Sequence, residues 1–568
     1  MTQAPCSDPS VQEALSQDEF HRARYVPGAR FLATTIGVLL SVYVVTVLFG
    51  PIVWGWDTYS SFARLHDATV ALRAGDLFPV WTPANANGFG SPVTFFYHKL
   101  FSLVGAFFTI ATGDAVTGFR LAVLLFSTVM FYGVQACAGR LGADTTSRLV
   151  IATASLYAPF ALRNLIEGCD VAQYAAMSII PLILAIVIDL QLGRFRKWQG
   201  AVLFVLLSLL ILAHVLIFVG VIGLLLLFAF HQVAVSGKGR WPFVVGAGAA
   251  LLAFVVLVYV PFVFWSVEFC PDQAKIFGAP DRNVMSFQSV FSPFPGSFTG
   301  WPLFALLAGM VIQICRPKSP RIVIAFGMVA LVLTLLVTRI GIPFWRASHL
   351  LDFVQFPYRL LTIAMPICFV AVAGLIERLP FAAKRRVQLG LLVIALLHAV
   401  AATHLYLNTF PTVALATLRQ ELPLTGTAAE VRVSPDAGGE YFPAAFQSQL
   451  ARIVVWKVSP NTVLPAPRSL VETAGCTYEN TPRPTYFNEL RVSVVCPTAG
   501  HLRVNQFSTP FLYSVATGSE GAIVKPVAND QFIDFALPAG QWNVVVKERT
   551  YLDLVLMAWR ARLSRYGI

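Results

Sequence analysis

Acidic, basic and aromatic side chains are concentrated between residues 54 and 100, directly after the first long apolar run of the chain. Asp57 lies only a few residues beyond that run, between Trp56 and further polar residues. Because tryptophan is enriched at the membrane–water interface, we expect Asp57 to lie at the membrane surface. A carboxylate there can act as general base on an acceptor hydroxyl while a lipid-borne substrate stays in the bilayer. The alternative is a helix N-cap, since Asp-Thr-Tyr-Ser is also typical of a helix start.

The same segment offers more side chains that could contact a substrate. His66 and Asp67 could orient a substrate or bind a metal, and the alternative is a solvated helix face. Trp81 lies in a Gly/Pro-rich loop and could stack on a sugar, and the alternative is a loop that only packs on the helices. The candidate substrate-binding residues of this segment are Arg64, His66, Asp67, Trp81, Tyr97, His98 and Lys99.

Two further acids, Glu167 and Asp170, lie in a very short turn between apolar runs. Carboxylates at that depth are costly unless they face a cavity. They are therefore candidates to line the same site, where they could position an acceptor or hold a divalent cation such as Mg²⁺ or Mn²⁺. No Cys/His set has the spacing of a zinc site.

The loop 339–359 carries arginines on the side of the membrane that the positive-inside rule leaves poor in basic residues. A lipid phosphate would explain them, because a guanidinium binds phosphate through two parallel hydrogen bonds. The alternative is pairing of Arg346 or Arg359 with Asp352 or Glu268. The candidate substrate-binding residues of this loop are Arg346, His349, Gln355 and Arg359.

Composition places these residues in a polytopic membrane protein. The chain has 568 residues, of which 57% are hydrophobic and 12% charged, whereas soluble domains carry about 25% charged residues. The net charge of +12 comes from Lys and Arg in the short breaks between apolar runs, which reports membrane orientation and argues against nucleic-acid binding. Residues 1–30 form a polar cytoplasmic tail, and the first apolar run lacks a cleavage site, so it is expected to remain as a signal-anchor.

The apolar runs predict about eleven transmembrane helices between residues 31 and 406, with the N-terminus cytoplasmic and the C-terminus outside. The run 199–232 is too long for one crossing and is expected to contain two helices that meet near His214. The run 95–112 is expected to be a juxtamembrane or re-entrant helix of the outer loop 54–117, because a crossing there would turn Arg140 outward.

Residues 407–568 change to short alternating segments punctuated by Pro and Gly, which predicts a small periplasmic all-β domain similar to a sandwich. The tail from Tyr551 is expected to be an interfacial amphipathic helix or a terminal strand with a frayed end. On the oxidising side of the membrane, Cys476 and Cys496 can form a disulfide within this domain, and a Cys169–Cys270 bridge between loops is the second candidate.

Several donor classes are excluded by the motifs. The sequence has no P-loop, no GxGxxG after a strand and no GxSxG, and the outer face has no supply of nucleotide sugars. An enzyme working there must use a donor carried in the membrane. A polyprenyl-phosphate sugar fits, because its phosphate is a ready leaving group and its tail can lie between helices.

Several stretches resemble the bacterial membrane proteins labelled "6-pyruvoyl-tetrahydropterin synthase-related". The first outer loop carries Asp57-Thr58, Gly75-Asp76-Leu77-Phe78-Pro79 and Gly88-Phe89-Gly90-Ser91-Pro92 of this family, and Gln355-Phe356-Pro357-Tyr358-Arg359 and Glu440-Tyr441-Phe442-Pro443 match later stretches. Ser61 and Gln173 stand where the family has His and Glu. Nothing here resembles the three-histidine zinc site of a soluble pterin synthase.

The architecture is similar to that of GT-C glycosyltransferases, which carry an acid in the first outer loop, many transmembrane helices and often an outer C-terminal domain. The resemblance implies that Asp57 is the catalytic base of a glycosyltransferase in the bacterial inner membrane. Its partners would be the bilayer, a polyprenyl-phosphate-linked sugar and a periplasmic or cell-surface glycan or glycolipid acceptor. The alternatives are a translocase or transporter of lipid-linked sugars, and a non-catalytic subunit of an envelope polysaccharide assembly complex.

Overall fold

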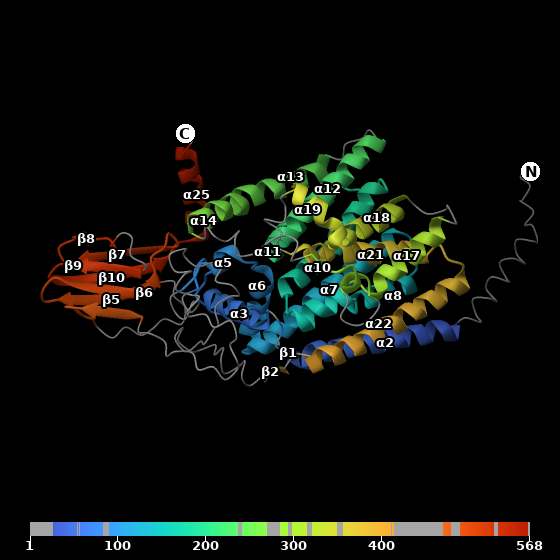
Figure 1. Cartoon of the computed structure of the whole chain (residues 1–568), viewed down its shortest axis with the longest axis horizontal. Helices are drawn as coiled ribbons and strands as arrows, with labels where there is room; N and C mark the ends of the chain where they lie inside the picture. Colours follow the sequence, from blue (N-terminus) through green and yellow to red (C-terminus); the bar gives the residue numbers. More distant parts are fainter. Residues whose placement is uncertain are drawn as a thin grey trace, which may run out of the picture.

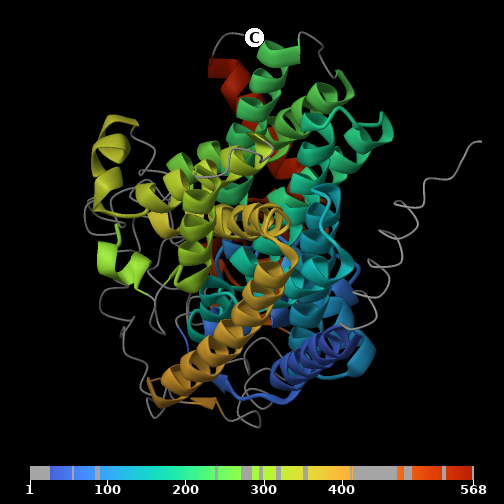
Figure 2. The same cartoon turned by 90° about the vertical axis from the view of Figure 1, so that its right-hand side faces the viewer.

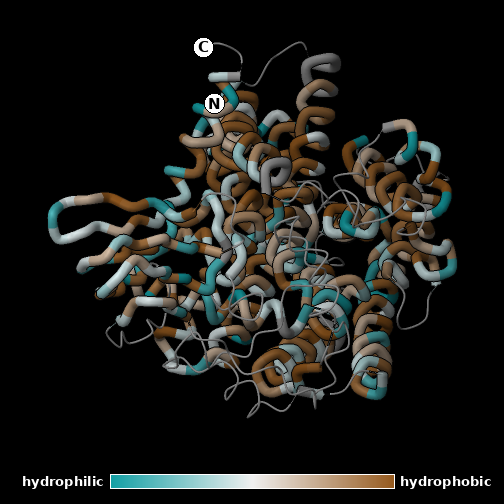
Figure 3. Tube along the Cα trace, turned by 60° about the vertical axis from the view of Figure 1, so that its left-hand side comes forward, coloured by the Kyte–Doolittle hydropathy of each residue, from teal (hydrophilic) through white to brown (hydrophobic). Residues whose placement is uncertain are grey.

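Long helices form a bundle at one end of the molecule and a β domain lies at the other, with the short helices α3, α5 and α6 between them (Figure 1). The computed structural model describes residues 26–53, 55, 57–82, 90–236, 241–269, 284–292, 298–314, 321–348, 356–409, 412–413, 470–478, 489–527 and 532–565. Apolar residues dominate the helical bundle, whereas polar and apolar residues alternate in the β domain (Figure 3).

Within the described residues, six helices are long and apolar enough to cross a membrane, or seven if one pair bent by 42° is a single crossing. The six are α2 (Val26–Phe49), α7 (Ala115–Arg140), α10 (Val171–Gln191), α13 to α14 (Trp241–Phe254 and Val260–Phe269, joined by the π-helix η2 at Val255–Tyr259), η5 with α21 (Pro357–Leu360 and Leu361–Ile376) and α22 (Phe381–Thr409). The bent pair is α8 (Thr145–Leu156) followed by α9 (Pro159–Leu162) and the π-helix η1 (Arg163–Glu167).

Shorter helices occupy the remaining predicted crossings, so the count of about eleven stays a prediction. They are α11 (Trp198–Ala213), α12 (Val215–Ser236), α17 (Trp301–Ile314) and α18 (Arg321–Leu336). The predicted break of the 199–232 run at His214 is confirmed, because α11 ends and α12 begins on either side of this residue. The other short helices are α3 (Thr58–Arg73), α5 (Val93–Phe96), α6 (Leu100–Thr112), α16 (Phe287–Phe291), η4 (Arg339–Gly341) and α19 (Ile342–Ser348).

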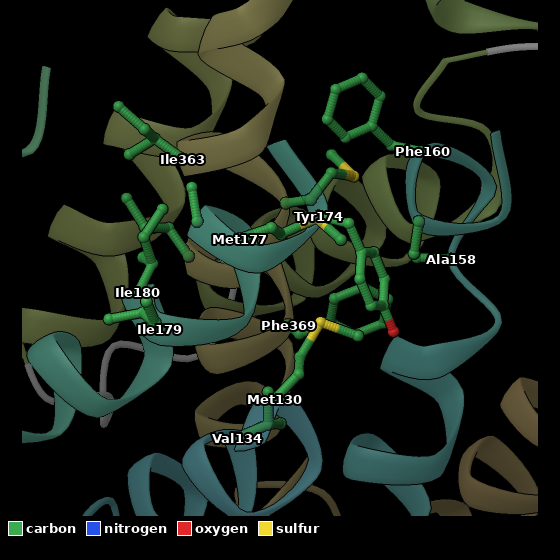
Figure 4. Packing of buried hydrophobic residues seen from close by; sticks show 14 of the residues in the cluster. Met130, Val134, Ala158, Phe160, Tyr174, Met177, Ile179, Ile180, Ile363 and Phe369 are labelled. Atoms are coloured by element: carbon green, nitrogen blue, oxygen red, sulfur yellow. The ribbon is translucent and has the colours of Figure 1, made fainter. Parts of the chain in front are cut away.

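Helices α10 and α21 form the centre of the bundle. Their apolar residues surround the whole helix circumference, as expected for helices that are buried on all sides. Tyr174 and Met177 of α10 lie near Met130 of α7 and Phe369 of α21 in this core (Figure 4). The hydroxyl of Tyr174 is 2.7 Å from Ser127 Oγ and 3.0 Å from the Tyr43 hydroxyl, so its polar atom is satisfied within the apolar core.

Helices α2 and α22 lie side by side and end at the same face of the bundle (Figure 2). Their exits are joined by a short antiparallel ladder between β1 (Ile52–Val53) and β2 (Thr412–Val413). Because α2 and α22 end at the same face, the chain must cross the membrane an even number of times between the end of α2 and the end of α22. With α2 itself added, the total number of crossings is odd. This arrangement agrees with the odd total that the basic residues predict.

Polar clusters mark the opposite face of the bundle, where α7 and α10 end and α8 and α22 begin. Arg140 Nε donates to Asp189 Oδ2 at 2.8 Å. Lys384 Nζ lies 2.6 Å from Asp144 Oδ2 and 3.0 Å from Glu377 Oε2. These ion pairs lie at helix ends rather than in the apolar middle of the bundle, as expected where charges are costly to bury in lipid.

The described part of the C-terminal β domain contains two antiparallel sheets, with strand orders β4-β5-β10-β7-β8 and β3-β6-β9. Its strands are β3 (Val471–Ala474), β4 (Thr477–Tyr478), β5 (Glu489–Cys496), β6 (Gly500–Phe507), β7 (Leu512–Gly518), β8 (Ile523–Val524), β9 (Phe532–Leu537) and β10 (Gly540–Glu548). Exposed and buried residues alternate strictly along β5, which is the pattern of a strand with one face on a core. The predicted all-β region and the Cys476–Cys496 disulfide are therefore confirmed.

The C-terminal tail is a helix, α25 (Tyr551–Arg565), which packs on α14 instead of ending as a strand. The Tyr551 hydroxyl donates to Leu257 O at 2.9 Å, and Trp559 Nε1 donates to Val256 O at 3.0 Å. Both carbonyls belong to the π-helix η2, where the regular hydrogen-bond ladder is altered. The helix therefore fixes the β domain to the helical bundle at a point where backbone carbonyls are available.

The disulfide should contribute measurably to the stability of the β domain. It closes a chain segment of 20 residues, for which the loop-entropy relation gives about 3 kcal/mol. We expect Cys476→Ser to lower the unfolding temperature of this domain, followed by circular dichroism of strand signal or by limited proteolysis. The matched control is Cys137→Ser, a buried free thiol in α7, which should leave proteolysis of the β domain unchanged. Equal protease resistance of Cys476→Ser and wild type would contradict the prediction.

Candidate functional site

Asp57 occupies the N-cap position of α3, but its side chain makes no capping hydrogen bond. Its backbone N–H instead donates to Gly168 O at 2.9 Å. One turn later, Ser61 Oγ donates to Cys169 O at 2.9 Å, so Ser61 fixes α3 to the same turn. The start of the first outer loop is thus held against residues 168–170 by two hydrogen bonds.

Asp170 stands at the N-terminus of α10, directly after this turn. Its carboxylate accepts a hydrogen bond from Gln173 N at 3.3 Å and another from the Gln173 side-chain amide. Burial raises the pKa of Asp170, and the charges of Arg359 and Arg64 and the hydrogen bonds from Gln173 oppose this effect. The group is therefore a half-buried acid whose protonation depends on neighbouring arginines, a pattern that recurs at functional sites.

Cys169, directly before Asp170, has a left-handed backbone conformation with φ of 50°. Such a conformation is strained for a residue with a side chain and often marks a functional turn. Its thiol is free and buried, so the predicted Cys169–Cys270 bridge is wrong for Cys169, and Cys270 lies outside the described residues. Burial raises the pKa of Cys169 to about 12, and the charges of Asp57, Arg64 and Asp170 act on the same thiol.

Arginines from two distant segments face these acids. The guanidinium of Arg64, on α3, lies 3.9 Å from the ring centre of Tyr97, a cation–π contact. Arg359 lies in η5, directly before α21. The hydroxyl of its neighbour Tyr358 experiences the charges of Asp170, Arg359 and Asp57. The cluster of Asp57, Asp170, Arg64 and Arg359 is named the acid–arginine cluster below.

Two histidines adjoin this cluster. The rings of His98 and His214 are stacked with centroids 3.9 Å apart and an interplanar angle of 26°. The ring of Tyr97 lies next to this pair, with its centroid 4.9 Å from that of His98 and a tilt of 56° between the two rings. The sequence indicates His98 as a candidate site residue. It indicates His214 only as the position of a helix break, and it does not indicate Tyr358 or Gln173 as site residues. A polar residue in the middle of a long apolar run was the signal for His214.

Other predicted site residues are held elsewhere. Glu167 forms an ion pair with Arg163 at 2.6 Å, and Arg163 also lies over the Phe298 ring. Trp81 is fully buried, and its Nε1 donates to Gln506 Oε1 of β6 at 2.8 Å, which leaves no ring face for a sugar. The stacking role expected for Trp81 is thus replaced by a contact between the outer loop and the β domain.

The remaining candidates are spread over several places. His66 is buried with its Nδ1 3.5 Å from Asp67 Oδ1, on α3. Lys99 donates to Thr94 O and lies 5.4 Å from the Tyr551 ring of α25, and burial lowers its pKa from 10.5 to about 7. Arg346 is exposed on α19. His349 and Gln355 lie outside the described residues.

The expected divalent cation finds few ligands in the described parts of the chain. Within them, no group of three or more His, Cys, Asp or Glu side chains is close enough to hold a metal ion. The carboxylate of Glu167 is taken by Arg163, and that of Asp170 by Gln173. We therefore derive no catalytic step through a metal.

The close packing of the outer loop on the turn at 168–170 can be tested at Gly55. A Cβ added there would lie 1.9 Å from Glu167 O, a backbone atom that cannot move aside easily. We expect Gly55→Ala to displace Asp57 and to lower both the thermal stability of the purified protein and any activity at the site. The control is Gly37→Ala on α2, where a Cβ meets nothing within 4 Å. Wild-type melting of Gly55→Ala would contradict this packing.

The described helices and sheets define a polytopic helical membrane protein with a C-terminal all-β region. Within this class, the chain belongs to the family of membrane proteins described as "6-pyruvoyl-tetrahydropterin synthase related domain", whose model matches residues 95–410. The sequence resemblance to this family is thereby confirmed. A comparison with curated proteins gives no match.

Among solved structures, the chain is similar to arabinofuranosyltransferase AftD from Mycobacteria, with 17% identity and a TM-score of 0.44 over 75% of this chain. It spans 28% of the length of that protein. It is also similar to ArnT from Cupriavidus metallidurans bound to undecaprenyl phosphate, with 15% identity, a TM-score of 0.42 and coverage of 76% of this chain and 81% of ArnT. The oligosaccharyltransferase of Archaeoglobus fulgidus matches with 11% identity and a TM-score of 0.39 over 72% of this chain and 58% of that protein.

Proposed function

We propose that the protein is a glycosyltransferase of the bacterial inner membrane. It transfers a sugar from a polyprenyl-phosphate donor to a periplasmic or cell-surface glycan or glycolipid. Its N-terminus is cytoplasmic, and the acid–arginine cluster and the β domain face the periplasm. The observation that carries the proposal is that the charges of two carboxylates and two guanidinium groups act on the same turn at residues 168–170, to which Asp57 N is hydrogen-bonded.

Each part of the acid–arginine cluster has a task in this reaction. Asp57 accepts the proton of the acceptor hydroxyl, which then attacks the anomeric carbon of the donor. Asp170 positions the acceptor, since its carboxylate is already oriented by Gln173. Arg64 and Arg359 hold the phosphate, and fixed cations of this kind stabilise the charge that develops on a leaving phosphate.

The β domain helps to position the outer loop. Glu548, at the end of β10, accepts hydrogen bonds from Val80 N at 3.2 Å and Trp81 N at 3.1 Å. Phe95 of α5 packs on Phe511 of the β domain with ring centroids 5.3 Å apart. These contacts with the β domain fix the outer loop that carries both Asp57 and His98, as a preorganised site requires.

The test is an assay of the purified full-length protein in lipid nanodiscs. Radiolabelled polyprenyl-phosphate sugars are added with an extract of envelope glycolipids, and both the labelled product and the released polyprenyl phosphate are measured. The proposal expects label transfer with release of polyprenyl phosphate. Movement of the intact lipid across a vesicle membrane without cleavage would instead indicate a translocase. Neither cleavage nor movement would favour a subunit of an assembly complex.

A further inference from the structure

The stacked histidines are held from both sides by backbone contacts. Lys99 N, next to His98, donates to Leu212 O at 2.9 Å. The N–H of Val215, the first residue of α12, donates to Nδ1 of His98 at 3.4 Å. The outer loop therefore closes over the break between α11 and α12, and the stack at its centre is fixed by two separate elements.

The two imidazoles differ in what their nitrogens can do. Because Nδ1 of His98 accepts from Val215, neutral His98 carries its proton on Nε2, which makes that atom a donor. His214 is only 1% exposed, and its Nδ1 has no hydrogen-bond partner outside its own residue in the part of the chain that the structure describes. A buried polar atom without a partner is costly, and a hydrogen bond from a ligand at this position would remove that cost.

The surroundings of the pair are cationic. Arg359 of η5 acts on both rings, and Arg64 of α3 and Lys99 at the start of α6 act on His98. Burial, reinforced by these charges, lowers the pKa of both histidines well below the ordinary value of 6.5. Both rings are therefore neutral at physiological pH, and an anion beside them would favour a protonated ring.

We propose that His98, His214 and Arg359 bind the phosphate of the lipid donor, and that His214 gains a proton as this phosphate leaves. The inference rests on the proposed function and deepens it. His98 contributes its Nε2–H as a fixed donor, and Arg359 contributes charge. A protonated His214 is stabilised both by the phosphate and by the neutral ring of His98 stacked on it.

The charges of the reaction explain why a proton acceptor is useful here. A polyprenyl-phosphate sugar is a phosphodiester with one negative charge. When the bond between the anomeric carbon and the phosphate oxygen breaks, the oxygen keeps the electron pair, and the product is a monoester with a second pKa of about 6. The acceptor oxygen bonds to the anomeric carbon and loses its proton to Asp57, which returns it to water. His214 takes one proton from water, so that the dianion is neutralised where it forms.

Product binding tests this inference separately from sugar transfer. The affinity of the full-length protein for undecaprenyl phosphate is measured from about pH 7 to pH 9, where the free lipid is a dianion. Wild type should bind up to about tenfold more weakly for each unit of rising pH over the range where bound His214 is protonated and free His214 is not, because binding then takes up one proton. The methyl phosphodiester of the same lipid, with one charge, should show a much smaller dependence. Titration calorimetry in buffers of different ionisation enthalpy should give net proton uptake on binding of the monoester.

Two variants identify the responsible group. His214→Asn keeps a polar group at the position of Nδ1 but cannot be protonated, so its affinity should be lower at pH 7 and nearly independent of pH. Lys99→Met should retain the wild-type slope, which matters because burial lowers the pKa of Lys99 to about 7. An unchanged slope in His214→Asn, a slope lost in Lys99→Met, or no proton uptake in wild type would overturn the inference alone. Failure of wild type to bind either lipid at any pH would overturn the proposed function as well.

Discussion

Asp57→Asn should lower the rate of sugar transfer by about 10²- to 10⁴-fold, which is the usual contribution of a general base. Asparagine has nearly the same shape as aspartate but cannot accept the proton of the acceptor hydroxyl. The two contacts that hold this part of the loop, from Asp57 N to Gly168 O and from Ser61 Oγ to Cys169 O, do not involve the replaced carboxylate. We therefore expect the variant to fold, to melt at nearly the wild-type temperature and to bind undecaprenyl phosphate as wild type does.

The measurement is the initial rate of label transfer in nanodiscs at saturating donor, together with a melting curve. Glu489→Gln is the matched control, since this carboxylate lies on β5 in an exposed pair with Arg491, and exposed pairs contribute about 0–1 kcal/mol. It should transfer sugar at the wild-type rate. A stable Asp57→Asn protein with unimpaired transfer would exclude Asp57 as the base and leave it a structural role.

The helices and the β strands were accessible from the sequence because they depend on local composition. The 199–232 run exceeds the thickness of a bilayer, which requires a break, and the polar His214 in its middle indicated where the break lies. The alternation of polar and apolar residues in β5 likewise follows from a single buried face. In contrast, the sequence of the tail left helix and strand open. The helix α25 is held by hydrogen bonds to carbonyls of η2, which lies about 300 residues earlier in the chain, and local composition does not reveal this contact.

The site was accessible in part. Asp57, Asp170, Arg64, Arg359 and His98 could be selected because charged or titratable residues near membrane helix ends are few. What composition could not reveal is which of them meet. Glu167 and Asp170 are three residues apart, yet the π-helix η1 turns Glu167 toward Arg163 while Asp170 begins α10. Likewise, Trp81 lies in the same loop as Asp57, but its indole is used by Gln506 of the β domain.

Arg359→Gln should raise the KM for the donor lipid by about 10- to 100-fold, since a hydrogen bond to a charged group is worth about 1.5–3 kcal/mol. Arg359→Lys keeps the charge but loses the planar pair of donors, so its KM should lie between those of glutamine and wild type. A further effect follows at Asp170. Arg359 opposes the burial that raises the pKa of this carboxyl, so its removal should raise that pKa further and shift the acidic limb of the rate profile to higher pH.

The sign of that shift separates two roles of Arg359. If the guanidinium only bound the phosphate, Arg359→Gln would raise KM and leave the acidic limb of kcat where it is in wild type. If it also keeps Asp170 ionised, kcat of the variant should fall at a higher pH than kcat of wild type, because a carboxylate with a raised pKa becomes protonated earlier as pH decreases. Arg491→Gln, on the exposed face of β5, should change neither quantity. An unaltered KM in Arg359→Gln would show that Arg359 does not bind the phosphate. The phosphate would then not be placed beside His214, and a proton acceptor there would have no purpose.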